Sequence, residues 1–440
     1  MPVFNRNNCC IALFVYVVLL VTACDNKQAS NSPVPADTPG ADKPLDPAAT
    51  LATESAWHTG QSILQTCVSS SENLRTAVRL FLENPSADTQ TQAQQAWQQA
   101  HHSVLAFSVY FAVGDNNPGL FGELIAYRDN LDAQPIQPGF IDYFSVYQFS
   151  GIVNDLAITL SAEALRQQHG ITDHSDVSIG LHAIEYLLWG EDGKRPVSDY
   201  APISSLNEEQ TQQGLRVVDL PNNRRRVYLQ LLAELLVDDC SRLADMWRDS
   251  TQSVVINYFA LQPGSRLQLW QSVTLNLIDK LTVQLDDASV SESPTDTETD
   301  ATENDTATPD SDTEIELALP HNQFAGQESR GIAAQLTSIS TLLYGERLSG
   351  ADNSNTELQP SNTIAVWLSL ETSSSDTNEA PVLALQAPIE QGIAKLNAQT
   401  QWPLPAADRE SLQQTLTELR NAIAGTAATT PVPDENPVNE

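Results

Sequence analysis

The 440-residue sequence is poor in positive charge. It has 22 Lys and Arg residues against 56 Asp and Glu residues, so its formal net charge is −34. Nucleic-acid binding needs clustered Lys and Arg that neutralise phosphates, and this charge balance therefore disfavours it. A large acidic excess keeps a protein soluble and can attract cations. Composition alone does not separate these two roles.

Cysteine is scarce too, and the spacings typical of several kinds of site are missing. Neither Cys-x-x-Cys nor His-x-x-x-His occurs, which argues against a structural zinc site. The serine nucleophile motif Gly-x-Ser-x-Gly, glycine-rich phosphate loops and a convincing β alternation are also absent. The five cysteines are Cys9, Cys10, Cys24, Cys67 and Cys240.

The N-terminal residues 1–23 have the features of a signal peptide. The apolar run 11–21 is shorter than the roughly 20 residues that a membrane-spanning helix needs. It ends in Val-Thr-Ala-Cys24, which resembles the lipobox of bacterial lipoproteins. This resemblance implies cleavage before Cys24 and lipidation of its thiol; an ordinary secretory signal and an uncleaved anchor are the alternatives. We expect a membrane-anchored lipoprotein in the envelope of a Gram-negative-type bacterium, facing the periplasm. Asp25 favours inner-membrane retention in some of these bacteria, so inner and outer membrane both stay open.

Apolar residues recur at three- and four-residue steps through most of the remaining chain, which predicts helices. We therefore expect an all-α fold of two helical-bundle halves. The expected helices span about residues 50–83, 87–113, 118–127, 151–169, 177–189, 221–249, 265–285, 325–348, 363–371, 382–397 and 408–424.

Two segments lack this period. Residues 24–49 are rich in Pro, Ala, Asp and Ser, which is typical of a disordered tether. Residues 286–316 are rich in Asp and Glu and contain no Lys or Arg. They predict a disordered acidic insert that acts as a solvated spacer or captures cations weakly. The expected units are an N-terminal helical bundle over 50–250, a helix leading onward over 251–285, a C-terminal bundle over 317–425 and a disordered tail over 426–440.

Residues 129–143 predict an ordered loop. Two prolines and a glycine exclude a regular helix, yet the segment is too apolar for a floppy connection. Ordered loops of this kind often carry function.

The strongest chemical signal lies in residues 180–192, Gly-Leu-His-Ala-Ile-Glu-Tyr-Leu-Leu-Trp-Gly-Glu-Asp. On a helix, His182 and Glu185 share one face, with Cβ atoms about 5–6 Å apart. Such a pair could chelate a cation or exchange a proton. The alternative is a core histidine that is hydrogen-bonded to a glutamate for structure.

This stretch resembles the Gly-x-His-x-x-Glu signature of the imelysin-like family, also classed as peptidase family M75. Gly180, His182 and Glu185 match the signature, and the continuation Tyr-Leu-Leu-Trp-Gly followed by Asp192 matches too. The resemblance covers about residues 50–249 well, and the second half is similar only in its helical layout. Further similar segments are Asp132-x-x-Pro135, Ile141-Asp142-Tyr143, 224–229 and 232–247. The implied fold has two helical-bundle halves, with the signature site in a cleft.

The resemblance implies two functions of different classes. One is metal binding linked to iron uptake, because imelysin-like lipoproteins are associated with iron acquisition. The other is peptidase activity, but a zinc peptidase usually offers three protein ligands and a separate base. His-Glu-x-x-His is absent, and Tyr186 stands where His-x-x-Glu-His would place its second histidine. We therefore expect a divalent or ferric ion, iron or zinc, and no catalytic residue. A non-catalytic scaffold with a vestigial site is the third alternative, and an envelope component of iron transport is the expected partner.

The expected metal ligands are His182 and Glu185, with Asp132, Asp142 and His101 as additional candidates. Many relatives place a carboxylate or an arginine on the helix that corresponds to 87–113. Here that helix has His101-His102 and no acidic residue between Asp88 and Asp115. Either histidine substitutes as a ligand, the site is incomplete, or the pair forms a polar helix face.

Two further groups have open roles. Cys67 and Cys240 lie on apolar helix faces and could form one disulfide in an oxidising periplasm, or stay two free, buried thiols. Arg224, Arg225 and Arg226 start a helix, where its dipole disfavours cations. They either pair with carboxylates elsewhere or are solvated.

Overall fold

The computed structural model describes residues 47–290, 324–345, 363–372, 382–399 and 402–427. The predicted signal peptide with Cys24, nearly all of the tether and most of the tail lie outside these residues. The chain divides into Met1–Pro44 and one compact unit, Leu45–Glu440. Among the described residues there is no strand, only an isolated bridge between Phe144 and Tyr147. The predicted all-α class is confirmed. Within the described ranges, no helix combines the length and apolarity needed to cross a bilayer.

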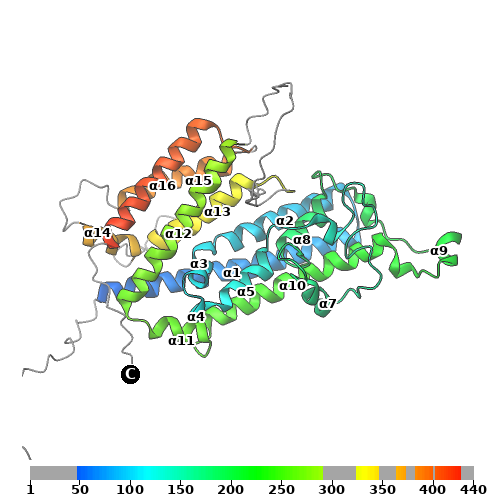
Figure 1. The fold of residues 1–440 in the computed structure, drawn as a ribbon, viewed down its shortest axis with the longest axis horizontal. Coiled ribbons are helices and arrows are strands. Elements are labelled where there is room, and N and C mark those ends of the chain that lie inside the picture. The colour runs from blue at the N-terminus through cyan, green and yellow to red at the C-terminus, as the bar shows by residue number, and fades with distance from the viewer. Residues whose placement is uncertain (1–46, 291–323, 346–362, 373–381, 400–401, 428–440) are drawn as a thin grey trace, which may run out of the picture. The chain divides into compact units, whose positions relative to one another are not determined.

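The elements follow one another as short and long helices (Figure 1). They are α1 (Pro47–Glu83), α2 (Ala87–Leu105), α3 (Ser108–Asn116), α4 (Pro118–Phe121), α5 (Glu123–Asp132), α6 (Pro138–Ile141), α7 (Ala162–Gln168), α8 (Leu181–Trp189), η1 (Val197–Tyr200), α9 (Glu208–Gln212), η2 (Val217–Asp219), α10 (Pro221–Arg248), α11 (Ser253–Ala260), α12 (Pro263–Val290), α13 (Glu328–Tyr344), α14 (Ile364–Thr372), η4 (Val382–Leu385), α15 (Gln386–Ala398) and α16 (Ala406–Ala427).

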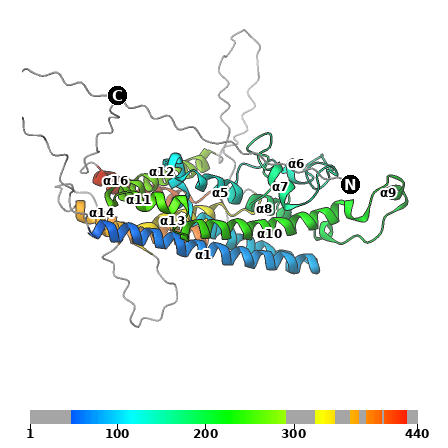
Figure 2. The ribbon, with the colours of Figure 1, turned by 90° about the horizontal axis from the view of Figure 1, so that it is seen from below.

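The long helices α1, α2 and α10 form the frame around the signature helix α8. Figures 1 and 2 show α1 and α10 side by side, and α8 contacts both α2 and α10. Aromatic packing joins α1 to α10, because the rings of Trp57 and Trp247 stack with centroids 3.7 Å apart. The indole N–H of Trp247 also donates to the carbonyl of Trp57 at 3.0 Å. This buried contact fixes how the two long helices pack against each other.

A second group of helices consists of α12, α13, α15 and α16. Contacts join α12 to α16, α13 to α15 and α15 to α16, and the group meets the first through α12 with α3 and α13 with α2. Helix α12 extends to Val290, so the first residues of the predicted acidic insert 286–316 are helical. The rest of that insert lies outside the described residues.

Several predicted helices differ in extent. The helix predicted over 87–113 is divided into α2 and α3 by a break at Ala106 and Phe107. The helix predicted over 177–189 begins only at Leu181, because Gly180 has φ +86°. In the predicted loop 129–143, α5 continues to Asp132, and the loop proper follows it.

The helix predicted over 151–169 is wrong except for the short α7. Arg224 explains the difference, because its guanidinium binds the backbone of the segment. The group donates to the carbonyl oxygens of Ile152, Val153, Asp155 and Ile158 at 2.7–3.0 Å. These tertiary hydrogen bonds take carbonyls that a helix would use itself, so local periodicity is overridden.

Candidate metal centre

The centre depends on a close approach between α5 and α8. Gly180 precedes α8, and a Cβ atom built on it would lie 2.7 Å from the carbonyl oxygen of Asn130 and 3.0 Å from that of Leu131. Only glycine tolerates both this contact and the positive φ. The approach brings the last residue of α5, Asp132, next to His182 in the first turn of α8.

Helix α2 is fixed along α8 by side chains on one of its faces. Gln90 and Gln94 donate to the carbonyl oxygen of Leu188 at 3.2 and 3.1 Å. One helical turn further, the indole N–H of Trp97 donates to the carbonyl oxygen of Leu181 at 2.7 Å. The next residue on this face is His101, whose ring stacks on Trp97 with centroids 4.8 Å apart. The α2–α8 contact therefore aims His101 at the first turn of α8.

Asp132 is the common partner of two histidines. Its Oδ1 lies 2.9 Å from Nε2 of His101 and 3.1 Å from Nε2 of His182. One donor atom from each of the three residues lies within 4.8 Å of the others. Both histidines are 3% exposed, and the Asp132 side chain is 8% exposed. Three potential ligands from α2, α5 and α8 thus converge at a site where their side chains are almost fully buried.

Glu185 contacts the side of His182 that faces away from Asp132. Its Oε2 lies 2.8 Å from Nδ1 of His182. Its Oε1 accepts backbone N–H groups from Phe324 at 3.1 Å and Ala325 at 2.8 Å. Since both oxygens are engaged, the predicted ligand Glu185 lies in position to orient His182 and leave its Nε2 directed at Asp132.

The two carboxylates control the charge of His182. Burial lowers the pKa of its imidazole, but hydrogen bonds and charge attraction from Asp132 and Glu185 outweigh burial and raise this pKa to about 10. In the metal-free protein at neutral pH, His182 is therefore an imidazolium between two carboxylates. A cation bound at Nε2 would take the place of a proton.

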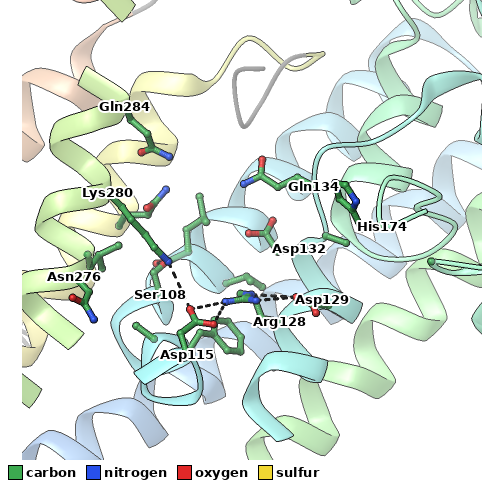
Figure 3. Close-up of a pocket in the computed structure, with 18 of the residues that line it drawn as sticks. Ser108, Asp115, Arg128, Asp129, Asp132, Gln134, His174, Asn276, Lys280 and Gln284 are labelled. Carbon is green, nitrogen blue, oxygen red and sulfur yellow. Dashed lines mark hydrogen bonds and ion pairs between the residues drawn. The ribbon is translucent and has the colours of Figure 1, made fainter. Parts of the chain in front are cut away.

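Asp132 also lines a large cavity of about 1030 Å³ (Figure 3). The cavity lies between α3, α5 and the 169–174 loop on one side and α12 on the other. Its walls carry more carboxylates than permanent cations, and both cations are held by acids. Arg128 contacts Asp115 at 2.7 Å and Asp129 at 3.2 Å, and Lys280 lies 3.6 Å from Asp115. A polar, acid-rich approach to Asp132 suits a cation.

The structure places Asp142 elsewhere. This fully buried carboxylate receives the guanidinium of Arg225 at 2.6 and 3.0 Å and that of Arg195 at 3.1 Å. It is not part of the histidine cluster, and its role is to hold the 142–155 segment onto α10. Of the three arginines at the start of α10, Arg225 pairs with this carboxylate. Arg226 instead donates to the carbonyl of Tyr200 at 2.9 Å.

The other histidines take different positions. Burial, and then the charge of Arg330, lower the pKa of His102, which is not part of the cluster and lines a smaller cavity. His169 and His174 line the large cavity. His174 is exposed, whereas His169 is half-buried and bonds the carbonyl of Asp129 at 3.1 Å.

Cys67 and Cys240 meet between α1 and α10. They are buried free thiols with Sγ atoms 2.7 Å apart. The hydrogen bond to Cys67, together with burial, raises the pKa of Cys240 well above its usual value. The two helix faces predicted to be apolar are thus in direct contact.

Comparisons with known proteins agree with the signature. The family model described as Imelysin, peptidase M75, matches residues 61–401. A search of curated proteins finds no significant match.

Two solved structures are similar over most of their length. One is a protein from Parabacteroides distasonis that has been assigned as an iron-regulated protein A precursor. Its TM-score is 0.55 at 12% identity, over 89% of this chain and 97% of that chain. The other is an imelysin-like protein from Psychrobacter arcticum, with a TM-score of 0.51 at 13% identity, over 87% of this chain and 96% of that chain. At these identities the likeness establishes the fold.

Proposed function

Because the chain belongs to the imelysin (peptidase M75) family, we propose that it is a metal-binding protein of the bacterial envelope, with His101, Asp132 and His182 as the metal ligands. The observation that carries this proposal is the convergence of three donor atoms from three helices within 4.8 Å. The proposed cargo is iron, and the proposed role is in iron uptake together with an envelope transport component. The similar structure described as iron-regulated supports this choice of metal.

The donor set supports iron in the divalent state. Two imidazoles and one carboxylate, with further positions open, form the set that non-haem Fe(II) sites use, and Zn²⁺ accepts similar donors. Ligands bound to one ion at about 2.0–2.2 Å lie roughly 3.0–3.6 Å apart. The distances from Asp132 Oδ1 to the two Nε2 atoms, 2.9 and 3.1 Å, are close to this range. Small movements of the side chains would therefore admit an ion.

The surroundings of Glu185 favour binding over peptidase activity. In a metallopeptidase the glutamate of the signature would have to act as a general base within reach of the metal-bound water. Here one oxygen holds His182 and the other accepts two backbone N–H groups. A carboxylate engaged in this way serves as a positioning group for a ligand.

Isothermal titration of the metal-free, full-length chain with Fe(II) under anoxic conditions, and with Zn(II), tests the proposal. His182→Ala, His101→Ala and Asp132→Asn should each weaken binding by at least tenfold. Glu185→Gln should weaken it by roughly 10- to 100-fold, as expected for an outer-shell partner of a histidine ligand. His58→Ala, on an exposed site of α1, is the matched control.

Unchanged metal binding in the His182→Ala and Asp132→Asn proteins would place the metal elsewhere. Chelator-sensitive cleavage of an unfolded protein substrate, lost in Glu185→Gln, would instead establish the peptidase.

We also propose that the mature chain is anchored by a lipid on Cys24, which rests on the lipobox-like residues before it. In a host that processes lipoproteins, the wild-type chain should fractionate with membranes and carry the mass of a lipidated cysteine. Cys24→Ala should release it or leave it unprocessed. An unmodified Cys24 in the mature protein would contradict the anchor.

A further inference from the structure

A second cavity, of about 260 Å³, lies beside the metal centre. It is formed where α2 faces the start of α13, and His101 and His102 line it together with Trp97 and Arg330. His101 thus has two neighbours: its Nε2 meets Asp132, while its ring borders this cavity. The cavity is distinct from the large one, which Asp132 lines.

Charge sets this cavity apart from the rest of the molecule. No Asp or Glu is among the described residues that line it, although the chain as a whole carries a formal charge of −34. Arg330 is half-buried there, and no ion pair or hydrogen bond of its guanidinium occurs within the described part of the chain. In the large cavity, by contrast, Arg128 is held by two aspartates. A half-buried guanidinium with no acidic partner among the described residues favours an anionic ligand.

The other walls define the size and character of that ligand. Glutamine side chains from α2 and Gln327 offer amide donors and acceptors. Trp97 and Leu105 lie beneath these groups and are 0% and 3% exposed, so polar side chains form most of the accessible wall. The volume is below the roughly 300–1,000 Å³ of typical drug-sized sites, so the ligand is small.

We propose that this cavity binds a small organic carboxylate, whose carboxylate pairs with Arg330 while its polar substituents meet the glutamines. A planar carboxylate matches the guanidinium in a bidentate pair, which a compact tetrahedral oxyanion fills less well.

The position of His101 links this ligand to the metal centre. A ligand in the cavity borders the imidazole that also meets Asp132, so its binding and metal binding should affect each other reciprocally. This coupling rests on the proposed function, whereas carboxylate binding itself does not.

Isothermal titration of the metal-free, full-length chain with 3-hydroxybutyrate tests the proposal. Binding should be at least about tenfold weaker in Arg330→Gln, because a charge-assisted pair is lost. It should be unchanged in Arg79→Gln, whose guanidinium lies exposed on α1 beside Glu83. Gln98→Glu adds a carboxylate to the cavity wall and should weaken binding as well, which covers the case that Arg330→Gln fails to fold.

The proposal would be overturned if the wild-type chain did not bind 3-hydroxybutyrate. It would also be overturned if Arg330→Gln and Gln98→Glu both bound it as tightly as wild type. Phosphate that binds as tightly as 3-hydroxybutyrate would overturn the choice of a carboxylate. A repeat of the metal titration with saturating 3-hydroxybutyrate then measures the coupling. Metal binding without carboxylate binding would remove only this inference, and carboxylate binding without metal binding would remove only the proposed function.

Discussion

At the scale of single residues, the centre is organised by one carboxylate oxygen. Oδ1 of Asp132 meets both histidines, and Glu185 holds His182 from the opposite ring nitrogen. The result is a chain of contacts in which imidazoles and carboxylates alternate, at a site that is almost fully buried. Without a metal, the imidazolium of His182 offsets part of the negative charge of Asp132 and Glu185. With a metal, the same groups are already oriented as ligands.

The sequence identified all four members of this chain but not all of their roles. The three-residue spacing predicted that His182 and Glu185 share one helix face, and in the structure their side chains are 2.8 Å apart. Spacing alone could not show that both oxygens of Glu185 are engaged, since its backbone donors Phe324 and Ala325 lie far along the chain. Asp142 was a reasonable candidate by its position in an ordered loop. Its partners Arg195 and Arg225 follow only from tertiary packing.

The raised pKa of His182 predicts a pH dependence of stability for the metal-free protein. Its folded-state pKa of about 10 exceeds the ordinary value of 6.5. The stabilisation is therefore fully present below pH 6.5 and decreases as the pH rises toward and through 10. Urea unfolding of chelator-treated wild type and His182→Gln measures it. The stability difference between the two proteins should be larger at pH 6 than at pH 9.5. A difference that does not change with pH would mean that the folded state holds a neutral imidazole.

At the scale of elements, the centre exists because α5 and α8 meet backbone to backbone. Sequence periodicity predicted α8 closely at its C-terminus, where Gly190 ends it, but placed its start four residues too early. The glycine in the signature is the reason. At Gly180 the backbone packs directly against the end of α5. This contact follows from the tertiary arrangement of the two helices, so the sequence pattern of α8 alone does not show it. The failed helix over 151–169 has a similar cause, because Arg224 binds its carbonyls from α10.

Gly180→Ala should therefore damage the centre more than an ordinary glycine replacement. The added Cβ would meet the carbonyl of Asn130 at 2.7 Å and push α8 away from α5. Gly214→Ala is the matched control, because Gly214 has φ +74° and no atom within 4 Å of such a Cβ. The control should lose only the roughly 1–2 kcal/mol of left-handed backbone strain. Gly180→Ala should lose more stability and bind metal more weakly, as measured by urea unfolding and metal titration. Equal losses in the two variants would show that the close approach has no role in the centre.

At the scale of the whole molecule, helical periodicity was sufficient for the fold class. Long amphipathic segments such as 221–249 needed no tertiary information, and α10 spans nearly those residues. The packing partners could not be predicted in this way, because apolar stripes show that a face is buried but not against what. The contact of α2 with α13, which forms the small cavity at Arg330, is of this kind. The division into two bundles with the boundaries given above stays a prediction.

The Cys67–Cys240 pair provides a test of the packing across the whole chain. The two thiols lie 173 residues apart in sequence, and their sulfur atoms are 2.7 Å apart between α1 and α10. In an oxidising compartment we expect them to form a bridge, as the sequence allowed. Chain-entropy arguments give about 5 kcal/mol of stabilisation for a closed loop of this length. Protein exported to a periplasm should resist alkylation when denatured without reductant, and it should accept two alkyl groups at these positions after reduction.

The cytoplasmic form of the same chain supplies the comparison, because its thiols stay reduced. Burial and the raised pKa of Cys240 keep them unreactive while the protein is folded. The exported protein should therefore unfold at higher urea concentration than the cytoplasmic form, and Cys67→Ala with Cys240→Ala should remove the difference. Two alkylated cysteines in exported, unreduced protein would contradict the bridge. Because α1 and α10 also frame α8, a bridged chain should keep the proposed metal centre folded to higher urea concentrations than a reduced one.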